Sequence, residues 1–227
     1  MSLPVKLGVG ALTLGSAVGA GYAGISYFSK EDKKEELNNT LQQGTAISKL
    51  ISDRFDYVLL NTTEGDNNPD KKHWDTIWTN YQRDNGTGTD VFELDGWSNR
   101  GSNNLTEALK TKCKSLSTST EESLYDNVTK YCSRGVTFEE QAKKDESTIL
   151  ETVKATHAKI WAQRHEAKGS TDAHLKNLEI TSNNPNGDDI KTGCGKAKEK
   201  NKQIDNYENI YASYKLICTK QPTDTEA

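Results

Sequence analysis

The sequence predicts a mostly α-helical protein, in which an N-terminal transmembrane helix is followed by a small helical ectodomain built from two degenerate helical repeats. Three observations lead to this fold class. An uncharged stretch lies near the N-terminus, apolar residues recur at helical spacing through the rest of the chain, and three short motifs occur twice in the same order. Only 33% of the 227 residues are hydrophobic. This is a low share for a globular protein, so we expect thin cores in the ectodomain.

The first 29 residues are predicted to form a membrane anchor or signal segment. Leu7–Phe28 runs for 22 residues without a charged side chain, and about 20 helical residues are enough to cross the hydrocarbon core of a bilayer. Lys30 begins a hydrophilic run that would end the span. The lipid bilayer is therefore the first predicted partner of the chain, through residues 7–28.

Two other interpretations of this stretch stay open. A signal peptide would be cleaved after Ala20 or Ala23, and a buried helix of a soluble core would need apolar surface that the rest of the chain hardly offers. Small residues four positions apart, such as Gly15 and Gly19, would let a second helix approach closely. Self-association through this small-residue face is a further expectation.

The remaining residues divide into four regions by composition and periodicity. Helices are expected where apolar residues recur three and four positions apart, with polar connections between them. In the second repeat this periodicity predicts helices over 147–168 and 199–218. The predicted regions are a polar stalk with an amphipathic helix (30–68, the helix at 45–60), helical repeat 1 (69–135), helical repeat 2 (136–220) and a disordered tail (221–227).

Three motif pairs indicate an internal duplication, because matches in one order with small insertions between them are typical of degenerate tandem repeats. The pairs are Ile77-Trp78 with Ile160-Trp161 at an offset of 83, Leu109–Cys113 with Ile190–Cys194 at an offset of 81, and the seven-residue spacing from Tyr125 to Cys132 with that from Tyr211 to Cys218 at an offset of 86. The residues expected to hold the scaffold are Trp74, Ile77, Trp78, Ile160, Trp161, Tyr125 and Tyr211.

The duplication suggests how the four cysteines pair. Cys113 with Cys132 and Cys194 with Cys218 would each link two helices within one repeat, which keeps the repeats equivalent. Four cysteines allow three pairings, and neither a crossed pairing nor four reduced, half-buried thiols is excluded by the sequence. A disulfide closing a loop of about 20 residues contributes about 3 kcal/mol in the chain-entropy model. That is a large share of what a thin core can supply.

Disulfides would place the body of the protein outside the cell, because cytosolic thiols are kept reduced. The lysines around the anchor favour the opposite orientation, since Lys30, Lys33 and Lys34 follow it and only Lys6 precedes it. We give the cysteines more weight. The expected localisation is therefore the cell membrane, with a single pass and an extracellular body.

The sequence gives little support to catalysis, and we expect a protein that is not an enzyme and uses no cofactor or metal. The cysteine spacings do not fit a zinc site, and the four histidines form no HExxH pair. Asp84, Asp90 and Asp95 lack the glycine and glutamate of an EF-hand, so a solvated turn is expected there. After residue 29 the net charge is −5, from 28 basic and 33 acidic residues, which argues against nucleic-acid binding.

The chain resembles the uncharacterised paralogous surface and membrane proteins of hemotropic mycoplasmas. The resemblance is carried by the start MSLPVKLGVGALTLGSAVGAGYAG, the Asn/Lys/Thr-rich body with its Ile-Trp pairs, the ending with Tyr seven residues before Cys, and the final Cys218-Thr219-Lys220. It implies a wall-less parasite of red blood cells and a role in surface display or antigenic variation. It supplies no catalytic residues.

Two functional hypotheses follow from these features. The first is a membrane-anchored surface antigen or adhesion protein that contacts a host surface or an antibody. Its solvent-facing loops, expected at 84–99 and 181–189, would vary while Trp78, Trp161 and the cysteines hold the scaffold. The alternative is an exported hydrolase or other enzyme, which would need a pocket with converging titratable groups.

Overall fold

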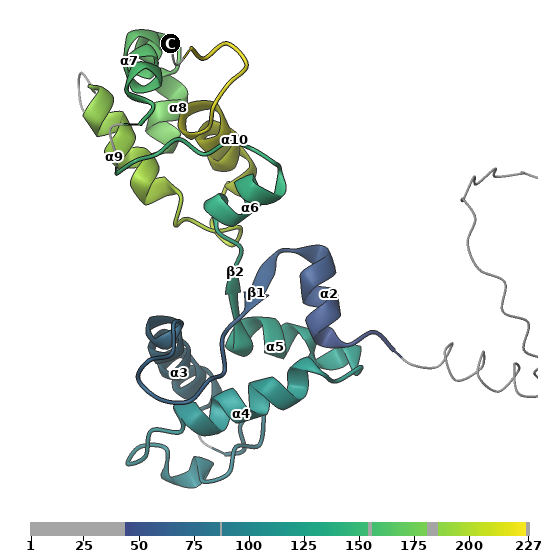
Figure 1. Ribbon diagram of the computed structural model, residues 1–227. Coiled ribbons are helices and arrows are strands. Elements are labelled where there is room, and N and C mark those ends of the chain that lie inside the picture. Colours follow the sequence, from purple (N-terminus) through teal and green to yellow (C-terminus); the bar gives the residue numbers. More distant parts are fainter. Residues whose placement is uncertain (1–43, 87, 154–155, 181–185, 226–227) are drawn as a thin grey trace, which may run out of the picture. The chain divides into compact units, whose positions relative to one another are not determined.

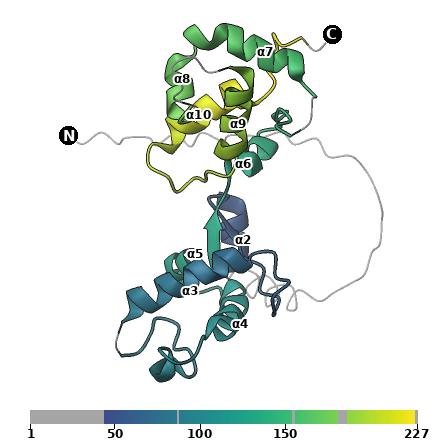
Figure 2. The ribbon, with the colours of Figure 1, turned by 90° about the vertical axis from the view of Figure 1, so that its left-hand side faces the viewer.

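The computed structural model describes residues 44–86, 88–153, 156–180 and 186–225, and helices dominate this part of the chain, as predicted (Figure 1). The predicted anchor (1–29) and residues 30–43 of the predicted stalk lie outside the described residues. Within the described ranges, no helix has both the length and the apolar composition needed to cross a bilayer. Figures 1 and 2 both show the helices gathered in two groups. We call residues 44–135 lobe 1 and residues 136–225 lobe 2.

Lobe 1 combines helices with a two-stranded antiparallel sheet, in which Leu59 lies opposite Ser133. Its first helix ends at Arg54. The next residue, Phe55, has a left-handed backbone (φ 55°), and its amide donates to the Ile51 carbonyl oxygen. This turn directs the chain into the first strand. The single helix predicted over 45–60 is therefore a helix followed by a strand. The elements are α2 (Ile47–Arg54), β1 (Tyr57–Leu59), α3 (Lys71–Asn85), η1 (Trp97–Asn99), α4 (Thr106–Ser117), η2 (Glu122–Leu124), α5 (Tyr125–Cys132) and β2 (Ser133–Gly135).

Lobe 2 begins directly after β2, and its first helix begins at Phe138. Thr137 and Glu140 form a capping box, in which the Thr137 hydroxyl accepts from the Glu140 amide and the Glu140 carboxylate accepts from the Thr137 amide. The helix predicted over 147–168 starts only at Ala158, and the one predicted over 199–218 starts only at Tyr207. The elements are α6 (Phe138–Lys144), α7 (Ala158–Glu166), η3 (Ala167–Gly169), α8 (Asp172–Asn177), α9 (Gly187–Ala197) and α10 (Tyr207–Cys218).

An extended segment takes the place of the predicted helix before α7. The Leu150 amide donates to the Cys218 carbonyl oxygen at 2.9 Å, and Ile149 forms an antiparallel bridge with Thr219. These bonds tie the segment to the end of α10, while Leu150 is almost fully buried. Short apolar runs fit a helix and a buried strand equally well, so periodicity alone does not separate the two.

Each lobe has its own hydrophobic core. Ile47 and Ile51 of α2 are buried in the core of lobe 1, so α2 belongs to the lobe and not to a stalk. The core of lobe 2 is formed by a separate set of residues that begins at Phe138. The largest fully buried side chains are Trp74 and Tyr81 in lobe 1 and Tyr214 and Phe138 in lobe 2.

The two lobes contain matching hydrogen bonds. In each lobe, the first residue of the first helix donates to a carbonyl two or three positions after the helix that carries the first cysteine. A later segment donates to the carbonyl of the second cysteine, and a tryptophan indole donates to the carbonyl of the residue that follows this segment. The matching bonds are Ile47 N to Ser119 O (2.9 Å) and Phe138 N to Lys200 O (2.7 Å), Leu60 N to Cys132 O (3.0 Å) and Leu150 N to Cys218 O (2.9 Å), and Trp74 Nε1 to Asn61 O (2.8 Å) and Trp161 Nε1 to Glu151 O (3.2 Å).

The indole bonds pair the tryptophans differently from the sequence motif. In this hydrogen-bond pattern Trp161 corresponds to Trp74 and not to Trp78. Trp78 lies about one helical turn further along α3, where its ring packs against Tyr81 and Trp97 with centroids 6.3 and 6.2 Å apart. Trp74 and Trp78 are both buried, so the Ile-Trp motif and the indole hydrogen bonds select different tryptophans of α3.

Candidate functional site: the disulfide-linked cores and the junction between the lobes

One disulfide closes each lobe. In lobe 1 it joins Cys113 of α4 to Cys132 of α5, with Cα atoms 5.4 Å apart, and in lobe 2 it joins Cys194 of α9 to Cys218 of α10, with Cα atoms 5.5 Å apart. These are the within-repeat pairs that the sequence predicts. All four cysteines are at most 2% exposed, so neither bond is open to solvent.

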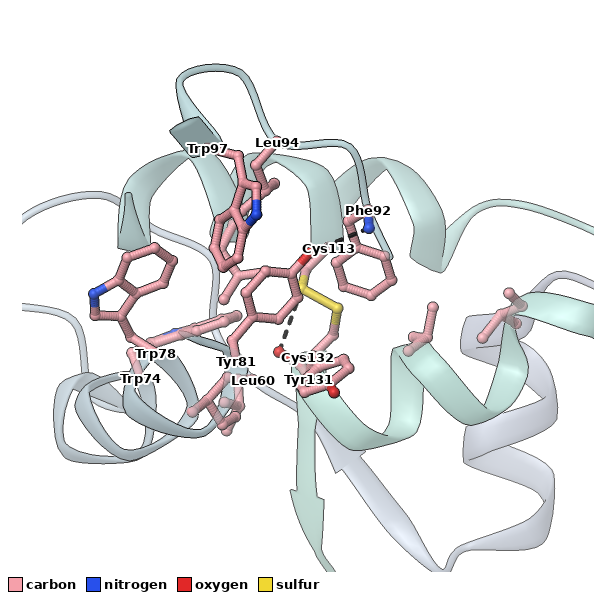
Figure 3. Close-up of a cluster of buried hydrophobic side chains, with 14 of the residues drawn as sticks. Leu60, Trp74, Trp78, Tyr81, Phe92, Leu94, Trp97, Cys113, Tyr131 and Cys132 are labelled. Carbon is pink, nitrogen blue, oxygen red and sulfur yellow. Dashed lines mark hydrogen bonds between the residues drawn. A yellow bond between two sulfur atoms is a disulfide. The ribbon is translucent and has the colours of Figure 1, made fainter. Parts of the chain in front are cut away.

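Tyr81 lies at the centre of an aromatic cluster beside the disulfide of lobe 1 (Figure 3). Its ring meets those of Tyr131 and Trp97 edge to face, at centroid distances of 4.8 and 5.5 Å, and that of Phe92 at 5.6 Å. Such aromatic pairs contribute about 0.5–1.5 kcal/mol each beyond their buried area. The cluster therefore fixes the loop after α3 against α5.

A buried carboxylate organises the loop after α3. Asp90 accepts a hydrogen bond from the Tyr81 hydroxyl. It also accepts from the amides of Phe92 and Leu94, each at 3.0 Å. Burial, together with the bond to Asp90, raises the pKa of Tyr81 above its ordinary value, so this hydroxyl stays protonated and donates. The solvated turn predicted at Asp90 is thus a buried structural turn, in which Asp90 is only 4% exposed.

The loop at 84–99, predicted to be solvent-facing, contributes to the core of lobe 1 instead. Phe92, Leu94 and Trp97 are 2%, 6% and 5% exposed. Sequence reasoning missed them because the segment has no helical period. The available signal was the alternation of apolar residues ahead of Gly96, whose positive φ (79°) allows the turn before Trp97.

Three tyrosines of α10 pack against Phe138 of α6 in lobe 2. Tyr211 stacks on Tyr207, with ring centroids 5.4 Å apart, and its hydroxyl donates to Asp145 at 2.8 Å. Burial and this hydrogen bond raise the pKa of Tyr211. These aromatic contacts fix α10, which carries Cys218, against α6, the first helix of its lobe.

The predicted scaffold residues differ in how deeply they are buried. Ile77 and Ile160 are buried, at 8% and 0% exposure, as is Tyr211 at 5%. Its sequence counterpart Tyr125 is only partly buried, and the Arg54 guanidinium lies 4.3 Å above the Tyr125 ring. The two tyrosines therefore share their spacing from the cysteine that ends each helix, and they differ in environment.

The C-terminal residues are bound to lobe 2, although the sequence predicts disorder from Gln221 onward. Arg164 of α7 donates to the carbonyl oxygens of Ile217 and Thr219, each at 3.1 Å, and forms an ion pair with Asp224. The Asp224 side chain is only 3% exposed. Burial alone would raise the pKa of this carboxyl, but hydrogen bonds from Arg164 and from the Gln221 amide lower it. Residues 226–227 of the predicted tail lie outside the described residues, as do 181–185 of the second predicted loop, and 187–189 begin α9.

The chain passes from lobe 1 to lobe 2 with hydrogen bonds on both sides. The Val136 amide donates to the Asp56 carbonyl oxygen, and the Val136 carbonyl oxygen accepts from the Lys202 amide, each at 3.0 Å. Thr137 forms an antiparallel bridge with Asn201. The junction is therefore a paired segment and not a free linker.

A polar groove of about 930 Å³ lies beside the junction, between α3, α5 and α6. Arg134 and Glu140 form a two-bond ion pair within it, with both N–O distances at 2.8 Å. The hydrogen bonds from Arg134 lower the pKa of Glu140 to about 2, so this carboxylate is ionised at neutral pH and is a poor proton donor. The acidic lining residues are Asp70, Glu139, Glu140 and Glu199, and the basic ones are Lys72, Lys130, Arg134 and Lys143.

One histidine lies next to a serine, in lobe 2. His174 Nδ1 is 3.0 Å from Ser213 Oγ, which also accepts from Asn177 and donates to the Asn209 carbonyl oxygen at 2.8 Å. Ser213 is fully buried. A hydroxyl whose proton is already bound to a carbonyl, and which no substrate can reach, stabilises the contact between α8 and α10 and does not act as a nucleophile.

Within the described ranges, no group of three or more His, Cys, Asp or Glu side chains is placed to hold a metal ion. Comparisons with protein families, with curated proteins and with solved structures find no match to this chain. The distinctive features of the described residues are the two disulfide-linked cores, the paired junction and the groove beside it.

Proposed function

We propose that the chain is a non-enzymatic surface protein, held at the cell membrane by its N-terminal segment, with residues 44–225 exposed outside the cell. The observation that carries this proposal is the use of all four cysteines in two buried disulfides. Disulfides persist in oxidising surroundings, such as the cell exterior, and are rare in the cytosol. The uncharged stretch at residues 7–28 supplies a route to that location.

The proposed role is antigenic or adhesive, with a host surface or an antibody as the partner. Two separate cores, each closed by its own disulfide, provide a stable base for exposed polar surface. The resemblance to the paralogous proteins of hemotropic mycoplasmas points to the same role. A display protein needs durability and variable surface more than it needs a reactive centre.

We also propose that the two lobes descend from one duplicated unit. The matching bonds of Trp74 and Trp161 and the equivalent disulfides support this origin. The unit would begin near residue 44 and include α2, which lies outside the repeat predicted from the sequence. It would end near Gly135 in lobe 1 and near Gln221 in lobe 2.

The exported hydrolase is the less favoured function. It would have to use the groove beside the junction, where Arg134 holds Glu140 and Lys143 holds Glu139 at 2.7 Å. Carboxylates kept ionised in this way are poorly suited to general acid catalysis at neutral pH.

Labelling of intact cells that express the full chain tests the proposal. A membrane-impermeant protease should remove a C-terminal epitope tag without cleaving a cytoplasmic marker. A maleimide reagent should label four cysteines after denaturation with reductant and none after denaturation alone. Protection of the tag together with four thiols that react without reductant would overturn the outward-facing model.

A further inference from the structure

Lobe 2 holds a corner of lobe 1 that consists of Phe55, Asp56 and Tyr57. Lys202 Nζ donates to the Phe55 carbonyl oxygen at 2.8 Å and forms an ion pair with Asp56 at 3.3 Å. Gln203 accepts from the Tyr57 hydroxyl at 2.9 Å and donates to the Asp56 carbonyl oxygen at 3.3 Å. The corner is thus bound through backbone, charge and side-chain hydroxyl together.

The Phe55 ring is the apolar part of the corner. The ammonium groups of Lys144 and Lys202 lie 4.1 and 5.6 Å from its centroid, within the range of cation–π attraction. We call Lys144, Asn201, Lys202 and Gln203 the acceptor edge of lobe 2.

The counterparts of these residues in the other lobe can be identified from the backbone. Phe55 and Glu146 both follow the first helix of their lobe and both have left-handed backbone, with φ of 55° and 56°. A Cβ atom on Gly44 would lie against Thr120, and one on Gly135 would lie against Asn201. Equivalent positions in the two lobes are therefore 91 residues apart around the first helix of each lobe. They are 81 residues apart in the segment after the helix that carries the first cysteine.

Applied to the acceptor edge, these offsets give a reversed charge in lobe 1. The counterparts of Lys144 and Lys202 are Asp53 and Glu121. On the corner, the counterpart of the Phe55 ring is the carboxylate of Glu146. If the second lobe of one molecule approached the first lobe of another as lobe 1 contacts lobe 2, Glu146 would meet two acidic side chains.

We infer that the acceptor edge is a recognition surface specific for the corner of lobe 1, and that the reversed charges at the equivalent positions block the same contact with a second copy of the chain. Units related by a head-to-tail contact extend into arrays unless their end surfaces prevent it. Repulsion between like charges is an effective way to reject one partner while keeping another. The head-to-tail arrangement therefore stops at the two lobes of one chain and does not extend to a second copy.

Recognition of the corner by the acceptor edge is tested by replacing Lys144 and Lys202 with the acidic residues found at the equivalent positions of lobe 1. In the full chain, Lys144→Asp with Lys202→Glu should increase hydrogen exchange at the Val136 amide by about tenfold or more, since the bond to Asp56 loses its support. The matched control, Lys196→Asp with Lys114→Glu, makes the same charge change away from the junction.

The amides of Leu60 and Leu150 report whether each lobe is still folded, because both are bonded within their own lobe. Their protection should be the same in the wild type, the edge variant and the control. If the edge variant leaves Val136 as protected as in the wild type, while Leu60 and Leu150 are unchanged, the acceptor edge is not a recognition surface.

The proposed block against a second copy is tested by photocrosslinking between copies of the full chain in detergent. With p-benzoylphenylalanine in place of the neighbouring Ser147, so that Glu146 is kept, crosslinked dimers should be several-fold more abundant when Asp53→Lys and Glu121→Lys are also present. The crosslinks should map to residues near 53 or 121 of the second copy. Contacts through the N-terminal segment are the same in both samples, so they do not affect the ratio. Equal yields, or crosslinks that map elsewhere, would contradict the proposed block.

Discussion

Arg164 and Asp224 form a two-bond ion pair, with Nη1–Oδ1 and Nη2–Oδ2 distances of 2.7 and 2.6 Å, between α7 and the last residues of the chain. Both side chains are nine-tenths or more buried. Because Arg164 also binds the carbonyl oxygens at the end of α10, this pair joins the C-terminus to the helix that carries Cys218.

Removal of one partner of this pair should be strongly destabilising. Asp224→Ala leaves the Arg164 guanidinium buried with only carbonyl partners, and we expect it to lower the free energy of unfolding by about 3 kcal/mol. Urea denaturation measures this change. The exposed neighbour Thr223 provides the control, since Thr223→Ala should have almost no effect. In the double variant Arg164→Met with Asp224→Ala, the loss of unfolding free energy should be smaller than the sum of the losses in the two single variants. A loss as large as that sum would contradict the pairing.

Loss of a disulfide should destabilise its own lobe. Cys113→Ala with Cys132→Ala opens a loop with a sequence separation of 19 residues, which costs about 3 kcal/mol in the chain-entropy model. Denaturation with and without reductant measures the effect. Reductant should lower the stability of lobe 1 in the wild type and should have no further effect on lobe 1 in the variant. The prediction would be contradicted if the stability of lobe 1 in the wild type were the same with and without reductant, even when the reductant is added to unfolded protein.

The glycine at the junction leaves no room for a side chain. A Cβ atom on Gly135 would lie 2.7 Å from Asn201 Oδ1 and 2.8 Å from Asn201 Cγ. We expect Gly135→Ala to cost about 1–3 kcal/mol through overpacking. Thermal unfolding measures this, with Gly169→Ala as the control because no atom lies within 4 Å of its added Cβ. Adding Asn201→Ala to Gly135→Ala should restore part of the loss, and no restoration would count against steric crowding.

The ion pair of Glu140 should make stability depend on pH. Its pKa is about 2 in the folded chain and 4.5 without the structure, so its contribution is fully present above about pH 4.5 and is lost as the pH falls from 4.5 towards 2. Glu140→Gln should therefore be less stable than the wild type at pH 7, and the difference should shrink through this window. Chemical denaturation at a series of pH values measures it, with the exposed Glu208→Gln as the control. A difference that stays constant from pH 7 to pH 2 would exclude this origin.

The sequence was most informative where chemistry and spacing coincide. Cys113, Cys132, Cys194 and Cys218 were paired correctly because only one pairing keeps the repeats equivalent, and the helices that carry them follow from apolar periodicity. Periodicity was misleading at Ile149 and Leu150, where a bridge to the end of α10 replaces the expected helix. Bonds of this kind depend on residues about 70 positions away, which no local pattern records.

The candidate site was predicted less well than the fold. Asp90 was predicted to lie in a solvated turn, but its role in holding Tyr81 and the loop amides depends on burial that the sequence does not reveal. The acceptor edge was not predicted at all. Lys202 lies in a lysine-rich segment that resembles ordinary solvated surface, and only the position of Phe55 in three dimensions distinguishes it.

Because each lobe completes its own interior and its own sulfur bridge, damage to one half need not spread to the other. Proteolytic cleavage of an outer loop or an unfavourable substitution in lobe 1 should leave lobe 2 folded. On heating, calorimetry should then show two unfolding transitions in place of one. A molecule organised in this way can accumulate changes in one half while the other preserves the shape.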